Sequence, residues 1–160
     1  LDTGRRELAG QLSSAGIETR VLPDSASMLW SKALVNAAVN PVTAAWDVPN
    51  GEILARPELR ETAFAAAREA DAVIRALRIR LLYADPEQEV RKVCEATAGN
   101  ISSMLQDVRR GSRTEIDAIT GVIIRTADRL RIPVPVNRSL FDKITALTER
   151  AQASSSARDR

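Results

Sequence analysis

Length, composition and charge already exclude several classes of protein. The chain has 160 residues, 44% of them hydrophobic but only 3% aromatic, which predicts one domain with an aliphatic core. Its 23 basic and 21 acidic residues nearly balance, and no aromatic residues are interleaved with the basic ones, so nucleic-acid binding is not expected. The absence of histidine removes histidine-based acid–base catalysis and most zinc sites, and no metal site is expected.

Cysteine content and hydropathy predict a reducing, aqueous location. The single cysteine, Cys94, cannot form an intrachain disulfide, which is typical of a cytoplasmic protein. With no histidine to activate it, Cys94 is expected to be a packed, inert thiol. No apolar run approaches the roughly 20 residues of a membrane span, and no signal peptide is visible. We therefore expect a cytoplasmic protein without membrane contact.

The first 22 residues differ in pattern from the rest of the chain. Residues 3–15 have the apolar spacing of a short helix, which Gly16 would end, and residues 17–22 alternate apolar and polar side chains as a strand does. A lone strand needs a sheet, and the later sequence offers no partner for it. Together with a start that lacks methionine, this pattern predicts that residues 1–22 are the remnant of an upstream dinucleotide-binding domain.

From Ser25 onward the spacing of apolar residues predicts helices almost throughout, so residues 23–151 are expected to form an all-α bundle. Turn and capping signals divide it into predicted helices at 27–40, 41–46, 58–80, 86–99, 103–108, 115–131 and 137–151. Pro57 suits the first turn of its helix. Residues 152–160 offer nothing larger than alanine to bury and are expected to be a disordered tail.

The first candidate site is a stripe of polar residues on the predicted helix 27–40. Lys32, Asn36 and Asn40 recur every four residues, which places them on one face with a drift of about 40° per step. The residues around them are mostly Ala, Leu and Val, as in a buried helix. A buried ammonium and buried amides need polar partners, which a ligand in a cleft would supply. The alternative is an ordinary solvent-facing stripe, and the pattern leaves both open.

A second candidate site lies where two predicted helices begin, within residues 100–117. Free N–H groups at helix N-termini favour a carboxylate or phosphate ligand. Ordinary capping is the alternative: Ser102 or Ser103 would cap one helix, and Thr114 the next, with Glu115 as a first-turn acid. Thr114 to Asp117 have the pattern of a capping box, so spacing alone does not make Glu115 catalytic.

Several stretches together resemble the C-terminal domain of ketopantoate reductase (2-dehydropantoate 2-reductase). They are Trp30-Ser31-Lys32 with Asn36, Asn40-Pro41 and Asn50-Gly51; Asn100-Ile101-Ser102-Ser103-Met104-Leu105-Gln106-Asp107-Val108; Thr114-Glu115-Ile116-Asp117 with Gly121; and Ile132-Pro133-Val134-Pro135-Val136-Asn137. The second stretch, followed by Thr-Glu-Ile-Asp a few residues later, is long and unusual. The resemblance runs from about residue 1 to residue 150.

The resemblance implies an N-terminal Rossmann domain followed by a helical domain like that of 6-phosphogluconate dehydrogenase, with the active site between them. The family's reaction is hydride transfer from NADPH to the ketone of 2-dehydropantoate, giving pantoate for coenzyme A synthesis. The implied partners are a small 2-keto acid and the N-terminal domain of the same chain, with a homodimer left open. The implied site residues are Lys32 as proton donor, Asn36, Asn40, Asn50 and Ser103 as substrate-binding residues, Asn100 lining the cleft, and Glu115 as an acid that supports catalysis and contacts the ribose beside the nicotinamide.

Some features depart from the family pattern. The Gly-rich phosphate loop of a dinucleotide-binding domain is absent from the sequence, so the chain alone is expected to be inactive. Arg78 and Arg131 stand at helix ends where the family often has glycine, in positions that favour a left-handed backbone, and small losses of stability are expected there. Thr120 stands where the family often has asparagine before the glycine matched by Gly121.

Two other functions remain compatible with the sequence. One is a reductase of the same family that acts on a different 2-keto acid, since the residues facing the substrate's methyl groups are not identifiable. The other is a non-catalytic helical dimerisation module, suggested by the wide apolar faces of the predicted helices 58–80 and 115–131.

Overall fold

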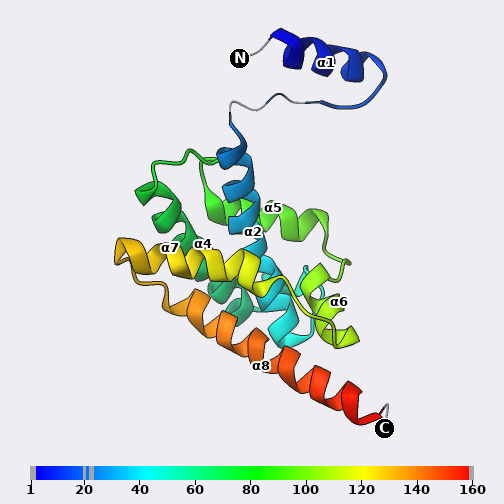
Figure 1. The fold of residues 1–160 in the computed structure, drawn as a ribbon, viewed down its shortest axis with the longest axis vertical. Helices are drawn as coiled ribbons and strands as arrows, with labels where there is room; N and C mark the ends of the chain where they lie inside the picture. The colour runs from blue at the N-terminus through cyan, green and yellow to red at the C-terminus, as the bar shows by residue number, and fades with distance from the viewer. Residues whose placement is uncertain (1–2, 20, 22–23, 159–160) are drawn as a thin grey trace.

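The computed structural model describes residues 3–19, 21 and 24–158 (Figure 1). In chain order the helices are α1 (Thr3–Ser14), α2 (Ser25–Trp46), α3 (Glu52–Ala55), α4 (Pro57–Ala76), α5 (Pro86–Ala96), α6 (Ser103–Arg110), the π-helix η1 (Asp117–Gly121), α7 (Val122–Leu130) and α8 (Pro135–Arg158). The described residues contain no strand, which confirms the all-α prediction for the bundle. Within the described ranges, no helix combines the length and the apolar character needed to cross a membrane.

The helix α2 runs through the middle of the bundle (Figure 1). It packs against α3, α4, α5, α6, α8 and η1, and Leu34, Ala37, Ala38 and Val42 are fully buried. The facing side of α4 is lined by small residues, among them Ala63, Ala66, Ala67 and Ala70. Such small side chains let two helices approach closely, so the core is aliphatic and densely packed, as the composition predicts.

Pro41 does not divide α2, which is a correction to the prediction of separate helices at 27–40 and 41–46. Proline removes one backbone hydrogen bond from a helix interior, but burial of α2 on nearly every side outweighs that loss. The hydroxyl of Thr43 donates to the carbonyl of Asn40 (2.9 Å) and adds a local bond beside the proline. The helix ends at Trp46, where Asp47 adopts a left-handed conformation with φ of 53°.

The helix α1 lies apart from the bundle (Figure 1). The helix α1 has no buried residue and contacts none of the other described helices. Gly16 ends it with φ of +81°, as predicted. Residues 17–19 and 21 form no strand, in contrast to the prediction for 17–22, whose residues 20 and 22 lie outside the described part. A strand needs a partner to bond with, and the described residues supply none.

Helix boundaries in the second half differ from the predictions at three places. The helix α4 ends at Ala76 and α5 at Ala96, each a few residues earlier than expected. The helix α8 begins at Pro135 and continues to Arg158, so residues 152–158 are helical instead of a disordered tail, while 159–160 lie outside the described residues. Alanine, glutamine and arginine favour helix, and no glycine or proline interrupts the run, which explains the longer helix.

Two helix ends carry arginine in a left-handed conformation, as the sequence predicts. Arg78 and Arg131 each have φ of 58°. At the end of α7 the N–H of Arg131 donates to Ala127 and Asp128, and the N–H of Ile132 donates to Ala127 at 2.9 Å. This bonding pattern is a Schellman motif, whose left-handed position suits glycine best.

We predict that Arg131→Gly stabilises the domain. The substitution removes the steric cost of a left-handed side-chain-bearing residue, about 1 kcal/mol, while keeping the backbone hydrogen bonds. Urea unfolding of the two proteins measures the difference, and Arg129→Gly, two residues earlier within α7, is the matched control that should destabilise. Equal or lower stability of Arg131→Gly would contradict the strain at this position.

Candidate functional site

A cavity of about 690 Å³ opens beside the first half of α2. Lys32 and Asn36 lie on its α2 wall, and the opposite walls come from the segment 82–85 and from α5. The lining mixes apolar side chains with charged ones; it comprises Met28, Ser31, Lys32, Val35, Asn36, Leu82, Tyr83, Ala84, Asp85, Gln88, Glu89, Lys92 and Val93. Most of the lining residues are polar or charged, so the cavity is more polar than the usual small-molecule site, in which a few polar groups stand among apolar ones.

The side chains of the polar stripe on α2 become more buried along the helix. Lys32 is exposed, Asn36 is half-buried and Asn40 is buried, with 9% of its surface exposed. A plain solvent-facing stripe would stay exposed along its length, so the burial of Asn40 does not fit that reading. The structure therefore places Lys32 and Asn36 on one cavity and Asn40 one turn deeper along the same helix.

The start of α6 is joined to α2 through two hydroxyl groups. The Thr43 and Ser102 hydroxyls lie 2.7 Å apart in a buried hydrogen bond. The Ser102 oxygen also accepts the N–H of Leu105 (3.2 Å) and so caps α6. The predicted cap is confirmed at Ser102. The following residue, Ser103, is left exposed at the first position of the helix.

Asn50 and Asn100 meet near the same end of α2. The N–H of Asn50 donates to the carbonyl of Asn100 (3.0 Å), and its side-chain Nδ2 donates to Thr97 at 2.8 Å. Its Oδ1 is buried and has no hydrogen-bond partner in the described structure, which is unfavourable unless a ligand or water donates to it. Gly51 allows this contact, because a Cβ there would lie 2.9 Å from that of Ala98.

Glu115 lies on the chain that enters η1. Its side chain is exposed, and its carbonyl accepts the N–H of Ile119 at 3.0 Å. The predicted capping box is wrong, because no side chain caps the start of η1. Asp117 instead binds Arg125, whose Nη1 lies 2.6 Å from Oδ1, and this contact lies over Gly121.

The structure thus brings the predicted residues into two groups. Lys32 and Asn36 share the cavity, while Asn50, Asn100 and Ser103 gather near the other end of α2, with Asn40 between. Asn100, Ser103 and Glu115 are exposed and do not line the cavity. The sequence analysis did not identify Thr43, its partner Ser102 or Tyr83 as residues that shape the site. Of these, only Thr43 could have been found from spacing, because it follows Asn40 by three residues and so continues the polar stripe.

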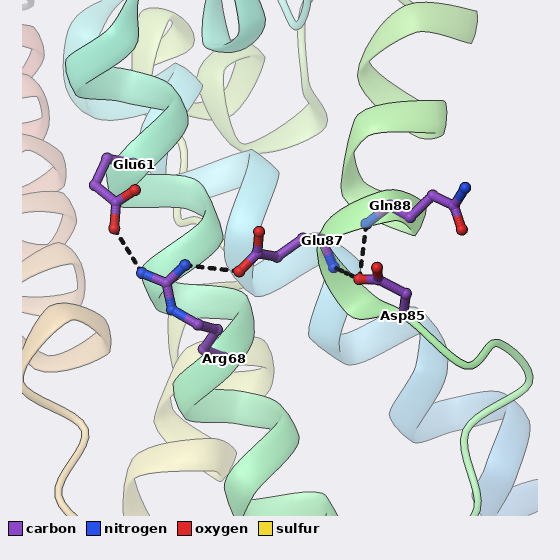
Figure 2. A network of polar contacts seen from close by, with 5 residues as sticks. All are labelled: Glu61, Arg68, Asp85, Glu87 and Gln88. Atoms are coloured by element: carbon purple, nitrogen blue, oxygen red, sulfur yellow. Dashed lines mark hydrogen bonds and ion pairs between the residues drawn. The ribbon is translucent and has the colours of Figure 1, made fainter.

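The α5 wall of the cavity is tied to α4 by a charged network (Figure 2). Arg68 of α4 contacts Glu87 of α5 at 2.6 Å and Glu61 at 2.5 Å, and these partners, Glu87 foremost, raise its pKa. Asp85 accepts the N–H groups of Glu87 and Gln88 and caps α5. The network is half-exposed and of modest strength, but together with the cap it fixes where α5 begins.

Two further groups near this wall stay protonated. Burial is the main cause that raises the pKa of Tyr83, and the negative charges of Glu89 and Asp71 raise it further. The phenol of Tyr83 therefore remains a hydrogen-bond donor. Burial, with a smaller contribution from the charge of Glu95, raises the pKa of Cys94 to about 11. Cys94 is fully buried and free, which confirms that the thiol is packed as expected, and a raised pKa disfavours the reactive thiolate.

These features define a class of protein: a helical domain that presents a lysine and amides along one partly buried helix, beside an open cavity. Comparison with known proteins identifies the family. Residues 24–148 match the family model "Ketopantoate reductase PanE/ApbA C terminal", and the chain belongs to the ketopantoate reductase family as its C-terminal domain.

Individual relatives agree with this assignment. The chain is 42% identical over 144 residues to a 2-dehydropantoate 2-reductase of Archaeoglobus fulgidus, covering 89% of this chain and 48% of that protein. A Pyrobaculum aerophilum protein of the same name is 37% identical over 139 residues, covering 87% and 50%. A crystal structure of a PanE/ApbA family ketopantoate reductase from Ralstonia eutropha matches with a TM-score of 0.82 at 31% identity, covering 92% and 49%. The chain spans about half the length of the curated relatives it matches.

We predict that Ser102→Ala destabilises the domain by about 1–2 kcal/mol, because α6 loses its cap and Thr43 loses a buried partner. Urea unfolding measures the change. Ser103→Ala is the matched control, since its exposed side chain caps nothing, and its stability should be close to that of the parent. If the two variants unfolded at the same urea concentration, the joint between α2 and α6 would not contribute as described.

Proposed function

We propose that this chain is the substrate-binding half of an NADPH-dependent reductase that converts 2-dehydropantoate to pantoate, a step that serves coenzyme A synthesis. The observation that carries the proposal is the placement of Lys32 and Asn36 side by side on the wall of one cavity, on the polar face of a helix whose second half is buried. Membership of the ketopantoate reductase family supports it.

Lys32 is proposed as the proton donor. Hydride attack on a ketone leaves negative charge on the carbonyl oxygen, which a nearby ammonium stabilises and then protonates. The side chain of Lys32 is exposed and takes part in none of the ion pairs formed by the described residues. Its charge is therefore available to a substrate. The chain has no histidine that could take the role instead.

Amides and a hydroxyl are proposed to hold the substrate. Asn36 lines the cavity beside Lys32, and Asn40 continues the stripe. The buried, unpartnered Oδ1 of Asn50 is an acceptor suited to a substrate hydroxyl. Ser103 and Asn100, both exposed near the start of α6, can donate to the substrate carboxylate. A 2-keto acid that also bears a hydroxyl group fits this set of donors and acceptors.

The cofactor is proposed to be held mainly outside this chain. A bound NADPH would supply the hydride, and Glu115, exposed at the entry to η1, is proposed to accept a hydrogen bond from its ribose. A carboxylate is a suitable acceptor for a ribose hydroxyl. The sequence has no Gly-rich phosphate loop, so we propose an N-terminal dinucleotide-binding domain, of which residues 1–22 would be the end. The exposed Leu8 and Ile17 would pack against that domain.

Another 2-keto acid is the second candidate for the substrate. A D-mandelate dehydrogenase, whose structure contains NADH and anilino(oxo)acetate, shares this fold with a TM-score of 0.78 at 24% identity. The fold alone therefore does not select one substrate. The apolar faces of α4 and α7, which suggested a dimerisation module, are packed in the core of this domain. A homodimer of the enzyme remains an open alternative.

We predict that Lys32→Ala, in the full-length protein containing this chain, lowers kcat for ketopantoate about 10²- to 10⁴-fold, the contribution typical of a general acid. NADPH oxidation measured with ketopantoate and a panel of other 2-keto acids tests both the residue and the substrate. Lys143→Ala is the matched control, because Lys143 lies over the ring of Trp46 and outside the cavity.

The control should retain the parent's turnover, and both variants should keep its unfolding temperature. Rapid reduction of a different 2-keto acid alone would retain the mechanism and change the substrate. Near-normal turnover of Lys32→Ala on every substrate would refute the proposed role of Lys32.

A further inference from the structure

The segment 79–84, between α4 and α5, reaches back to the first half of α2 (Figure 1). Its start is fixed by the left-handed Arg78, after which the N–H of Ile79 donates to Ile74. Its end is fixed by Asp85, which caps α5. The segment has no regular secondary structure of its own, yet Leu82, Tyr83 and Ala84 form a wall of the cavity that contains Lys32.

Two hydrogen bonds join this segment to a single residue of α2, Ser31. The phenol of Tyr83 donates to the Ser31 carbonyl (2.8 Å), and the N–H of Leu82 donates to the Ser31 hydroxyl (2.9 Å). Ser31 is 5% exposed, so water competes little for either bond. Because both the main chain and the side chain of Ser31 are held, the segment can neither slide along α2 nor move away from it without breaking a partly buried bond.

Ser31 directly precedes Lys32, the residue proposed as proton donor. The lysine ammonium sits on a flexible four-carbon stem, and no ion pair with a described residue orients it. Its position therefore depends on where the backbone of α2 lies and on the cavity wall opposite. Core packing fixes the backbone of α2, and the two bonds to Ser31 fix the wall, because they attach it to the helix position next to Lys32.

We propose that Tyr83 and Ser31 form a positioning pair for Lys32, an inference that rests on the proposed function of Lys32. The pair sets the distance between α2 and the segment 82–84 and so confines the lysine stem. Neither residue is proposed to touch the reacting atoms or to exchange a proton with the substrate. The high pKa of Tyr83 is consistent with this role, because a phenol that stays protonated keeps donating to Ser31.

Tyr83→Phe in the full-length enzyme removes the phenol hydroxyl and little else. We expect kcat for the preferred 2-keto acid to fall about tenfold, within the roughly hundredfold loss that a 1 Å misplacement can cause. KM should change by less than about twofold, because the substrate-binding amides are untouched. Ser31→Ala, which removes the other bond, should have a similar effect, and the double variant should lose less than the product of the two.

Thr145→Val is the matched control. It also removes a partly buried hydroxyl that donates to a backbone carbonyl, that of Phe141 at 2.9 Å, but it lies on α8 and outside the cavity. The control should leave kcat unchanged, and thermal unfolding of all variants reports any general loss of stability. The rate of a single turnover with NADPH already bound shows whether hydride transfer itself is slowed.

The outcomes separate this inference from the function on which it rests. A lower kcat and a slower single turnover in Tyr83→Phe, with KM and the control unchanged, support the positioning pair. Unchanged kcat in Tyr83→Phe, in an enzyme that Lys32→Ala inactivates, overturns the pair and leaves the proposed function intact. If Lys32→Ala is itself fully active, the proposed function fails and the positioning pair fails with it.

Discussion

Burial of the second half of α2, residues 37–44, is the constraint on which the rest of the structure depends. The helix packs against α3, α4, α5, α6, α8 and η1, and yet polar residues recur along one of its faces. A buried polar group is tolerated only with a partner. Thr43 forms a hydrogen bond with Ser102, and Ser31 accepts hydrogen bonds from Leu82 and Tyr83. Lys32 has no such bond with a described residue and is exposed. The shape of the candidate site follows from how each polar position is satisfied.

Close packing around α2 limits which residues can stand nearby. Alanines on α4 let it approach, and Gly51 leaves room for the backbone of Ala98, which positions Asn50 against Asn100. Because these contacts rest on small residues and on backbone hydrogen bonds, they form a rigid support for side chains that project into the site. Flexible residues, Lys32 above all, are then placed by their neighbours.

Local signals made most of the fold predictable from sequence. Asp85-Pro86 and Ser102 mark helix starts by capping chemistry, and the structure has helices there. Predictions failed where tertiary packing outweighs a local signal: Pro41 lies inside a continuous buried helix. They also failed where two local patterns competed, as at Thr114, whose capping-box pattern gives way to a π-turn with the Asp117–Arg125 contact. The helix α8 also continues beyond its predicted end at residue 151, through residues with no glycine or proline to stop it.

The candidate site was predictable only in part, for a related reason. Lys32, Asn36 and Asn40 share one helix, so their spacing already places them on one face. Tyr83 lies 52 positions from Ser31, and no periodicity or cap connects residues so far apart in an irregular segment. Core packing fixes α2, and the 79–84 wall is held by two hydrogen bonds, by the helix ends on either side and by the packing of Ile79, Leu81 and Tyr83 against the core. Leu82 and Ala84 are the exposed residues of this wall that line the cavity, so their side chains can change without disturbing the core, and the fold alone does not determine what this face of the cavity accepts.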